Sequence, residues 1–553
     1  MKEVSIKLVS GEEKTILYGT RVNEIFGNLL KEKTNNPVIA ARINNELVSL
    51  SFKIEINSNV EPVRLFSNPG IRLFRRTLSF ILAKASVTLF PERHLVISHS
   101  LGDSYYYYYN GQEEISDEDI DLLQKEMDRI VKNRCDIERR VISYNEAINF
   151  FQKINQPATA KLLKYRNDSK IPIYYCGGFI DISYEPLLPN TELLKPFKIH
   201  NYAPGFLLRY PNRKTPDKLD PFKDMPSLFS VYKEYKAWGK ILNVNCVGKL
   251  NELSENREIK PFIRVAEALH NKKISQIADS IAERRENVRV ILVAGPSSSG
   301  KTTFTKKLSI QLRVMGFNPV SISLDNYYLP NNEAPLDEHG KPDFESLYSL
   351  NIDLLNKHLL QLFEGKEVEI PIFDFKTGKP KDTGTPLQLT KRNILLIEGI
   401  HGLNPGLTPQ VKDNLKYKIY ISALTQLNMD DHNRIPTTDN RLVRRMVRDH
   451  HFRGNSAEIT LNMWPSVRRG EEKNIFRFQD QADSVFNSAL DYELAVLKIY
   501  ATPILRTIKP GNDVYNEAIR LLSFLDNFSS IPPQYVPDQS ILREFIGGSA
   551  FSY

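Results

Sequence analysis

Residues 290–303 read Val-Ile-Leu-Val-Ala-Gly-Pro-Ser-Ser-Ser-Gly-Lys-Thr-Thr, and this stretch decides the fold of the C-terminal half. Its apolar beginning predicts a buried strand, and the segment after Gly300 has the spacing of a helix. Between them lies the pattern G-x-x-x-x-G-K-[ST], which in a strand–loop–helix context is typical of a phosphate-binding loop. The glycines let backbone N–H groups turn toward phosphate oxygens, and the helix N-terminus adds partial positive charge.

Each residue type in this loop has a chemical task. Lys301 is expected to reach the β- and γ-phosphates of ATP as a catalytic cation, and the Thr302 hydroxyl is expected to bind Mg²⁺. The predicted cofactors are therefore ATP and Mg²⁺. No guanine-reading N-K-x-D occurs in the chain, which disfavours a GTPase. The residues predicted to contact ATP are Gly295, Ser297, Ser298, Ser299, Gly300, Lys301, Thr302 and Thr303.

Outward from the loop, short apolar runs alternate with helical patterns. Such alternation predicts a parallel sheet covered by helices on both faces. The predicted strands lie at 288–294, 320–324, 394–397, 417–421 and 503–508, and the predicted helices at 301–315, 350–364, 440–450, 480–497 and 513–526.

Two acids follow predicted strands, at the edge where an open α/β sheet binds its ligand. Asp325 follows the second strand and is predicted to take the proton from an attacking hydroxyl; the alternative is a turn or helix-capping acid. Glu398 closes the third strand and is predicted to hold Mg²⁺; the alternative is a buried, hydrogen-bonded acid. His401, close behind, is interpreted as a structural residue.

Four arginines recur at helical spacing further along. Arg441, Arg444, Arg445 and Arg448 stand at i, i+3, i+4 and i+7 and share one helix face. A charged face is often only solvated, but four like charges repel one another unless an anion is present. The pattern, with Arg453 just beyond it, favours a mobile lid that closes over transferring phosphates.

Taken in order, GPSSSGKTT, LDNYY, IPIFDF, LLIEGIHGLN and RLVRRMVRD resemble the uridine kinase/phosphoribulokinase family of P-loop kinases over about 285–510. The resemblance implies phosphorylation of a sugar hydroxyl by ATP, for uridine kinases the 5′-hydroxyl of the nucleoside. It implies that Asp325 is the catalytic aspartate and that Glu345 takes the ribose hydroxyls. The implied nucleoside pocket comprises Tyr328, Phe344, Glu345, Phe373 and Phe375, and the implied phosphate-facing lid residues are Arg445, Arg448 and Arg453.

The sequence also departs from that family. Gly378 aligns with the histidine that reads the pyrimidine, Asn455 aligns with a lid arginine, and Phe373 lacks a tyrosine hydroxyl. A nucleoside kinase, tried first on uridine and cytidine, is therefore the expected function. One alternative is a kinase of another sugar or sugar phosphate. The other is an RNA-binding regulatory protein in which the P-loop domain acts as a nucleotide switch.

The front half is expected to be α+β. A strand at 3–9, an amphipathic segment at 22–30 and a hairpin around Asn44-Asn45 make residues 1–63 resemble a TGS module, a β-grasp unit. The next block is similar to the editing-type domain of threonyl-tRNA synthetases. That domain's paired histidines align with Arg76 and Phe80, and Cys176 alone cannot build its site. No editing or zinc chemistry is expected, which leaves an RNA-contacting, nucleotide-sensing or purely structural role.

Within this block, the tyrosines at 105–109 predict a strand, with a base-stacking platform as the alternative. The Pro- and Asn-rich stretch at 184–222 predicts irregular loops. The whole chain is thus expected to be a multidomain α/β protein. Its predicted parts are 1–63 (TGS-like), 64–240 (editing-like), 241–286 (helical connector), 287–530 (kinase) and 531–553 (a tail lying on the surface or on another subunit).

The composition of the chain indicates which partners and which cellular environment are expected. The chain has 553 residues and a net charge of +8, so a phosphate-bearing partner is permitted but not required. Three widely spaced cysteines give no disulfide framework, which suits a reducing cytoplasm. The longest mostly apolar stretch, 78–90, carries Lys84 and is too short to cross a bilayer. No membrane association is expected.

Overall fold

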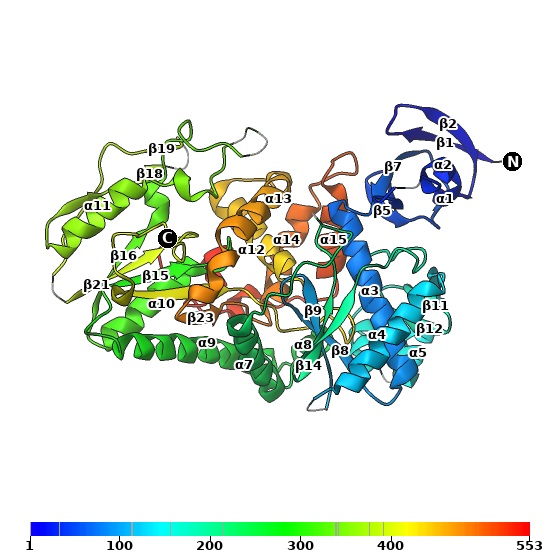
Figure 1. The fold of residues 1–553 in the computed structure, drawn as a ribbon, viewed down its shortest axis with the longest axis horizontal. Helices are drawn as coiled ribbons and strands as arrows, with labels where there is room; N and C mark the ends of the chain where they lie inside the picture. Colours follow the sequence, from blue (N-terminus) through cyan, green and yellow to red (C-terminus); the bar gives the residue numbers. More distant parts are fainter. Residues whose placement is uncertain are drawn as a thin grey trace.

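The computed structural model describes residues 2–32, 34–111, 114–154, 156–213, 215–337, 340, 342–374, 377–390 and 392–552. Figure 1 shows a small N-terminal domain, a middle α+β domain and a larger C-terminal domain, joined by a group of helices. Among the described residues, no helix combines the length and the apolarity that a membrane crossing requires.

The N-terminal domain is a five-stranded sheet with two short helices. The strand order is β2-β1-β7-β4-β5, with β1 and β7 parallel. The predicted hairpin is confirmed: β4 and β5 are joined through Asn44 and Asn45, whose φ values of 50° and 64° are ones asparagine tolerates. The elements are β1 (Glu3–Leu8), β2 (Glu13–Leu17), β3 (Thr20–Arg21), α1 (Val22–Ile25), α2 (Gly27–Leu30), β4 (Val38–Ile43), β5 (Glu46–Ser49), β6 (Lys53–Ile54) and β7 (Ser58–Arg64).

The middle domain contains a four-stranded sheet of order β13-β14-β9-β8 and a three-stranded sheet of order β10-β11-β12. The predicted tyrosine strand is confirmed as β9, and Tyr106, Tyr107 and Tyr109 are buried in it, so they form core rather than an open platform. The elements are α3 (Asn68–Leu89), β8 (Leu95–Ser100), β9 (Ser104–Tyr109), α4 (Asp117–Lys132), β10 (Glu138–Ser143), α5 (Tyr144–Lys153), α6 (Pro157–Leu163), β11 (Lys170–Cys176), β12 (Phe179–Asp181), β13 (Lys198–Tyr202) and β14 (Gly205–Arg209).

The prediction of loops throughout 184–222 was wrong. Strands β13 and β14 lie inside that stretch, and β14 pairs with the tyrosine strand β9. Each strand is only five residues long and is flanked by proline-rich sequence. Their burial comes from pairing with a strand almost 100 residues earlier, which local pattern does not reveal.

Three helices connect this domain to the next: α7 (Pro226–Leu242), α8 (Val247–Glu255) and α9 (Ile259–Ala282). The longest, α9, packs along α10, which begins at the phosphate-binding loop. Its buried residues Ile263 and Ile274 belong to the same hydrophobic core as the C-terminal sheet. The connector is therefore part of the kinase-side core rather than a free linker.

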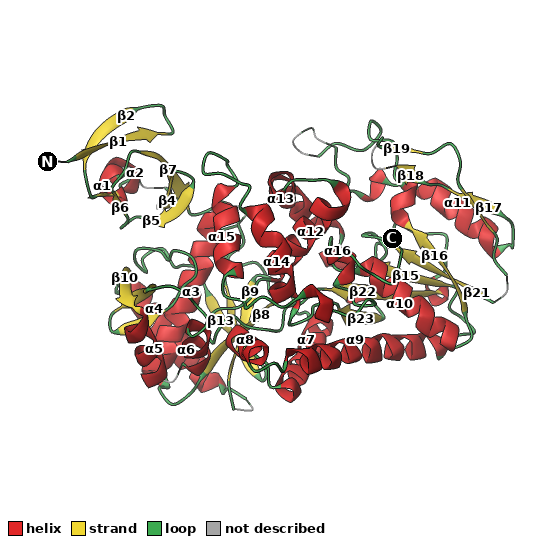
Figure 2. Cartoon of the chain, turned by 180° about the vertical axis from the view of Figure 1, so that it is seen from behind, coloured by secondary structure: helices red, strands yellow, loops and turns green. Residues whose placement is uncertain are grey.

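The C-terminal sheet has five parallel strands, which lie in the order β16 (Asn318–Ser323), β21 (Asn393–Glu398), β15 (Val290–Ala294), β22 (Lys416–Ser422) and β23 (Ser484–Asn487). Alternate residues of β15 face opposite layers, because side chains alternate along a strand. Ile291 and Val293 pack with α9 and α10, whereas Val290 and Leu292 pack with α11. Figures 1 and 2 show helices on both sides of the sheet. This confirms the predicted covered parallel sheet.

The fifth strand is not where the sequence placed it. The run at 503–508, predicted as a strand, includes the end of α14 (Glu493–Leu505), and β23 (Ser484–Asn487) lies in a stretch predicted as helix. Leu494, Val496 and Leu497 are all buried, so this helix is apolar on nearly every side. Periodicity does not distinguish a fully buried helix from a buried strand.

The remaining elements of this domain complete both layers and the loops above the sheet. They are α10 (Lys301–Val314), α11 (Ile352–Phe363), β17 (Val368–Ile370), β18 (Phe373–Asp374), β19 (Lys379–Pro380), β20 (Thr385–Leu387), α12 (Thr437–Arg453), α13 (Ala457–Asn474), α15 (Tyr515–Leu525) and α16 (Arg543–Ile546).

Candidate active site

The phosphate-binding loop joins the end of β15 to the first residue of α10. Gly300 has a φ of 80°, and a Cβ there would lie 2.5 Å from the Ile541 side chain, so only glycine fits. Lys301 opens the helix and donates a hydrogen bond to the Pro296 carbonyl at 3.2 Å. Ser298 and Ser299 are buried. The backbone thus has the strand–loop–helix form that the sequence predicted.

Two of the four helix-face arginines support the loop from behind and cannot belong to a lid. Arg441 is 1% exposed and donates to the Ser297 carbonyl at 3.0 Å. Arg444 is fully buried and donates to the Ser298 carbonyl at 3.3 Å. The expectation of a mobile face was wrong for this pair, because α12 packs against the loop. Their carboxylate partners are Glu471 and Glu493, respectively.

The three arginines predicted as phosphate-facing lie together. Arg445 donates to the Ser297 hydroxyl at 2.7 Å. Asp449 pairs with all three: with Arg445 at 3.2 Å, Arg448 at 2.7 Å and Arg453 at 3.6 Å. Repulsion from Arg448 lowers the pKa of Arg453. Three cations share one acid beside the loop, an arrangement that an anion would stabilise.

The two predicted strand-end acids lie beside the loop. Asp325 stands in a 3₁₀ turn (Leu324–Tyr327), where its N–H donates to the Ser323 hydroxyl at 3.4 Å. One oxygen of Glu398 accepts hydrogen bonds from the Thr302 hydroxyl at 3.3 Å and from Ser323 at 3.4 Å. Burial, then the nearby charge of Asp325, raises the pKa of Glu398 to about 7.

This geometry fits Mg²⁺. The Thr302 hydroxyl and the Glu398 carboxylate are adjacent oxygen ligands, and the neighbouring Asp325 supplies a second negative charge that a dication would neutralise. Within the described ranges, no group of three His, Cys, Asp or Glu side chains could hold a metal by itself. Such a site suits a metal that shares its coordination with substrate phosphates and water.

The raised pKa of Glu398 has a measurable consequence for stability. The pKa of this carboxyl is about 7 in the folded chain and 4.5 in the unfolded reference. Its contribution to the free energy of unfolding is therefore fully present below about pH 4.5 and is lost as the pH rises through about 7. We expect Glu398→Gln, which never ionises, to gain stability relative to the original chain between pH 5 and pH 8. Thermal denaturation without nucleotide or Mg²⁺ should show a relative shift of about 2–4 °C, the change that roughly 1 kcal/mol produces. A pH-independent difference between the two proteins would contradict the assignment.

The predicted acceptor residues gather on the other side of Asp325. The rings of Tyr328 and Phe373 lie 5.7 Å apart, and the Tyr328 hydroxyl donates to the Phe344 carbonyl at 3.1 Å. Phe344 is 40% exposed, whereas Phe373 is buried. The structure therefore brings the rings of Tyr328 and Phe373 together, and Phe344 adjoins them through its backbone carbonyl. Phe375, also predicted for this pocket, lies outside the described residues.

Glu345 is the most unusual group of the acceptor pocket. Burial, followed by the charge of Glu471, raises its pKa to about 7. Its Oε2 atom is buried without a hydrogen-bond partner among the described residues. A buried carboxylate oxygen without a donor is costly, so this atom is suited to accept hydrogen bonds from a bound ligand.

Asn331 contacts the position where the family's base-reading histidine was aligned. Its N–H donates to the Gly378 carbonyl at 2.9 Å. A Cβ on Gly378 would lie 2.1 Å from the Asn331 side-chain amide, and the φ there is 68°, so a larger residue would require Asn331 to move and would strain the backbone. The sequence had no signal for Asn331, because it is 47 positions away. His401 is 1% exposed, in agreement with its structural interpretation.

Two further acids that sequence reasoning missed contact the phosphate-binding loop. Glu471 accepts a hydrogen bond from the Ser297 N–H at 3.0 Å. Glu544, from the C-terminal tail, accepts from the Thr303 N–H at 3.1 Å and from the Thr303 hydroxyl at 2.7 Å. The tail therefore packs on its own nucleotide loop, with Ile541 and Phe545 fully buried. Each acid thus occupies hydrogen-bond donors that the loop would otherwise offer to phosphate oxygens.

Glu544 should compete with ATP for the Thr303 donors. We expect Glu544→Ala to lower the KM for ATP by about tenfold, because the nucleotide no longer displaces a charge-assisted hydrogen bond. The matched control is Asp538→Asn, which changes another carboxylate of the same tail, and it should leave the KM unchanged. A higher KM in Glu544→Ala would show instead that the tail contributes to ATP binding.

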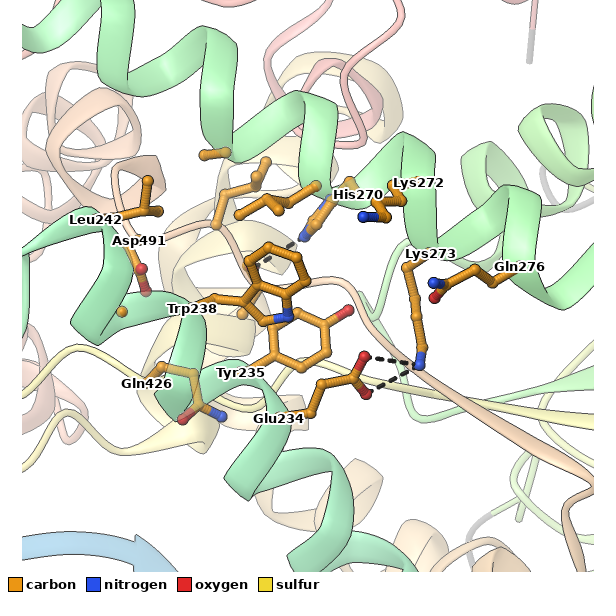
Figure 3. A pocket seen from close by; sticks show the side chains of 15 residues that line it. Glu234, Tyr235, Trp238, Leu242, His270, Lys272, Lys273, Gln276, Gln426 and Asp491 are labelled. Carbon is orange, nitrogen blue, oxygen red and sulfur yellow. Dashed lines mark hydrogen bonds and ion pairs between the residues drawn. The ribbon is translucent and has the colours of Figure 1, made fainter.

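A small pocket between α7 and α9 is not a candidate for either substrate (Figure 3). Its volume is about 40 Å³, which suits one or two water molecules rather than a nucleoside. Trp238 and Tyr235 form one wall, and Lys273 pairs with Glu234 at 2.9 Å across its opening. Both amide atoms of Gln426 and Nδ1 of His270 are buried there without protein partners in the described part of the chain. Ordered water would satisfy them.

Comparison with known proteins separates the two halves. A sequence profile of the "Phosphoribulokinase / Uridine kinase family" matches residues 290–495. The N-terminal region is similar to the threonine–tRNA ligase of Carboxydothermus hydrogenoformans (30% identity over 204 residues, 37% of this chain and 32% of that protein). It is also similar to threonine–tRNA ligase 2 of Bacillus subtilis (29% over 199 residues, 36% and 31%). The chain spans about a third of the length of these curated relatives.

Two solved structures were also found to be similar over part of this chain. One, from Bacillus stearothermophilus, is described as a possible uridine kinase, with 17% identity and a TM-score of 0.26, covering 38% of this chain and 97% of that one. The other is a D-glycerate 3-kinase from Cryptococcus neoformans, with 15% identity and a TM-score of 0.23, covering 50% and 87%. From the matched residues and the geometry of the loop, the chain carries a C-terminal P-loop kinase domain of the phosphoribulokinase/uridine kinase family, joined to an N-terminal region similar to threonyl-tRNA synthetases.

Proposed function

We propose that the protein is a nucleoside kinase that transfers the γ-phosphate of ATP to the 5′-hydroxyl of a ribonucleoside. The observation that carries the proposal is the position of Asp325. Its charge acts on Glu398 at the metal-binding side, on Tyr328 in the acceptor pocket and on Arg453 above the loop. One carboxylate thus adjoins all three parts that a phosphoryl transfer to a hydroxyl requires.

In the proposed reaction, a carboxylate oxygen of Asp325 accepts the proton of the 5′-hydroxyl as that oxygen attacks the phosphorus. Lys301, the loop N–H groups and the arginines around Asp449 hold the phosphate oxygens in line. Mg²⁺, held by Thr302 and Glu398, supplies charge neutralisation at the phosphates when bound. The loop's own donors must first release Glu471 and Glu544.

Glu345 is proposed to read the ribose. Its unpartnered oxygen would accept hydrogen bonds from the vicinal 2′- and 3′-hydroxyls, while Tyr328 and Phe373 provide flat surfaces for the base. We expect Glu345→Ala to raise the KM for a ribonucleoside by about 10- to 100-fold, since a hydrogen bond to a charged group contributes about 1.5–3 kcal/mol. The preference for ribose over 2′-deoxyribose should fall together with it.

Steady-state kinetics with uridine and 2′-deoxyuridine measures both effects. Glu333→Gln is a suitable control, because it changes an exposed carboxylate in the same stretch between Tyr328 and Phe344. An unchanged KM in Glu345→Ala, with the original thermal stability, would remove Glu345 from the pocket.

The function itself is tested by ATP consumption with Mg²⁺ against ribonucleosides, deoxynucleosides and sugar phosphates, with the products identified by mass. A nucleoside 5′-monophosphate product supports the proposal. Turnover of a sugar phosphate alone would favour a phosphoribulokinase-like acceptor. This second candidate is supported by Gly378, which stands where the base-reading histidine of uridine kinases aligns. ATP binding without turnover of any acceptor would favour a nucleotide-dependent switch.

A further inference from the structure

A large cavity lies between the front domains and the kinase domain. Its volume is about 1410 Å³, more than the roughly 300–1,000 Å³ of most small-ligand sites. Residues of α3, β8 and β9 line it on one side, and residues of α12, α13 and α15 line it on the other. It extends to Pro296 of the phosphate-binding loop, but neither Asp325 nor Glu345 belongs to its walls.

Two arginines in this cavity lie against two tyrosine rings. The Arg434 guanidinium is 4.8 Å from the centroid of Tyr105, and that of Arg75 is 4.3 Å from the centroid of Tyr210. The two rings meet edge to face, 5.0 Å apart. Burial raises the pKa of the Tyr105 phenol, yet Arg434, Arg75 and Arg76 together hold it below its ordinary value. All three guanidinium groups therefore lie close enough to the Tyr105 phenol to act on its charge.

Neighbouring acids leave this charge only partly compensated. The carboxylate of Asp103 is 4.0 Å from Arg75, and the Nε of Arg75 is buried without a partner. Among the residues that the structure describes, no carboxylate forms an ion pair with Arg434. Of the three arginines around Tyr105, Arg76 has a close acidic partner, Glu185 at 2.6 Å. Arg75 and Arg434 together thus present a surplus of positive charge.

A buried histidine adds an unused hydrogen-bonding group to the same wall. His99 lines the cavity and is 4% exposed, and its Nδ1 has no partner among the described residues. Burial, followed by the charge of Arg434, lowers its pKa to about 3, so the ring is neutral at physiological pH. A neutral imidazole can donate to a ligand oxygen without adding charge.

Arg434 is held in place by contacts between the two domains. The Ile97 N–H donates to the Asp431 carbonyl at 2.9 Å, and the Ile97 carbonyl accepts from the Asn428 amide at 2.6 Å. His432 pairs with Asp181 at 2.6 Å. These bonds join the loop before α12 to the middle domain, so the arginine is preorganised and a ligand there would contact both domains.

We propose that this interdomain cavity binds the phosphate group of a mononucleotide through Arg75, Arg434 and His99. The planar guanidinium fork matches the geometry of a phosphate, and the tyrosine rings and the size of the cavity admit the nucleoside part. A small ligand fits better than an extended nucleic acid, because Glu517 neutralises Arg72 and Arg520 and further carboxylates, such as Asp103 and Glu472, lie among the basic residues of the walls.

The test is calorimetric titration of the four ribonucleoside 5′-monophosphates into the full chain carrying Lys301→Ala, which disables the phosphate-binding loop. We expect at least one of them to bind at a single site. Adding Arg434→Gln should weaken that binding at least tenfold, and Arg75→Gln should do the same. Arg42→Gln is the matched control, because Arg42 lines the same cavity but pairs with Glu61 at 3.2 Å. It should leave the affinity unchanged.

Three outcomes would overturn the proposal. The first is that no monophosphate binds to the Lys301→Ala protein. The second is binding that persists in folded Arg434→Gln and Arg75→Gln proteins but is lost in Glu345→Ala, which would place the ligand in the kinase acceptor pocket. The third is Arg434-dependent binding of a 12-nucleotide single-stranded RNA without binding of any mononucleotide, which would assign the cavity to RNA. Circular dichroism and thermal denaturation establish that each variant is folded.

Discussion

Replacing Asp325 with asparagine should lower kcat by about 10²- to 10⁴-fold, the usual contribution of a positioned general base. The asparagine keeps the size of the side chain and the backbone bond to Ser323, but it cannot accept the hydroxyl proton. The KM for ATP should change little, because the phosphate contacts come from the loop and the arginines. Initial rates with the best acceptor of the panel, measured from pH 6 to 9, provide the readout.

The control variant for this experiment is Asp353→Asn, which changes an exposed acid in the first turn of α11. It should retain full activity. Turnover by Asp325→Asn within threefold of the original rate, with unchanged thermal stability, would exclude Asp325 as the base. The proposed mechanism would then fail, although the family assignment of the domain would stand.

A second substitution, at Arg444, tests a buried ion pair that supports the phosphate-binding loop. Arg444 and Glu493 are both at most 2% exposed, and the Arg444 Nε donates to Glu493 at 3.0 Å. Arg444→Leu should cost about 3–5 kcal/mol of folding free energy, because it leaves a buried carboxylate without its partner. Denaturant unfolding of the nucleotide-free protein measures this cost.

Two further variants isolate the cause. The double replacement of Arg444 and Glu493 by leucine should recover most of the lost stability, since no uncompensated charge remains. Arg453→Leu, on the same helix but 52% exposed, should cost no more than about 1 kcal/mol. An Arg444→Leu protein as stable as the original would show that the buried pair contributes nothing to the fold.

The candidate site could be predicted wherever its residues follow strands of the sheet. Asp325 and Glu398 come directly after β16 and at the end of β21, and parallel strands bring their carboxyl ends to one edge. The loop at 295–303 carries its own glycine and lysine pattern. For these residues, neighbours in sequence determine the geometry, so local pattern was sufficient.

Helical spacing, by contrast, shows which residues share a face but not what covers that face. Arg441 and Arg448 share one face of α12, yet the first is buried against Glu471 while the second is partly exposed beside Asp449. The difference depends on how α12 packs against the loop and α13. The same limit explains the missed strand β23, whose four residues are recognisable only beside β22.

The sequence by itself determined the phosphate-binding loop and covered parallel sheet of the C-terminal half and the likeness of the front half to threonyl-tRNA synthetases, and it predicted the strand-end acids that the structure places beside the loop. Only the tertiary structure decided that the tail places Glu544 on Thr303, 241 residues away, and that Arg75 and Arg434 meet across a domain boundary. The physical reason is that covalent spacing dictates local backbone form and strand order. Burial and charge compensation, in contrast, depend on which distant surfaces the folded chain brings into contact.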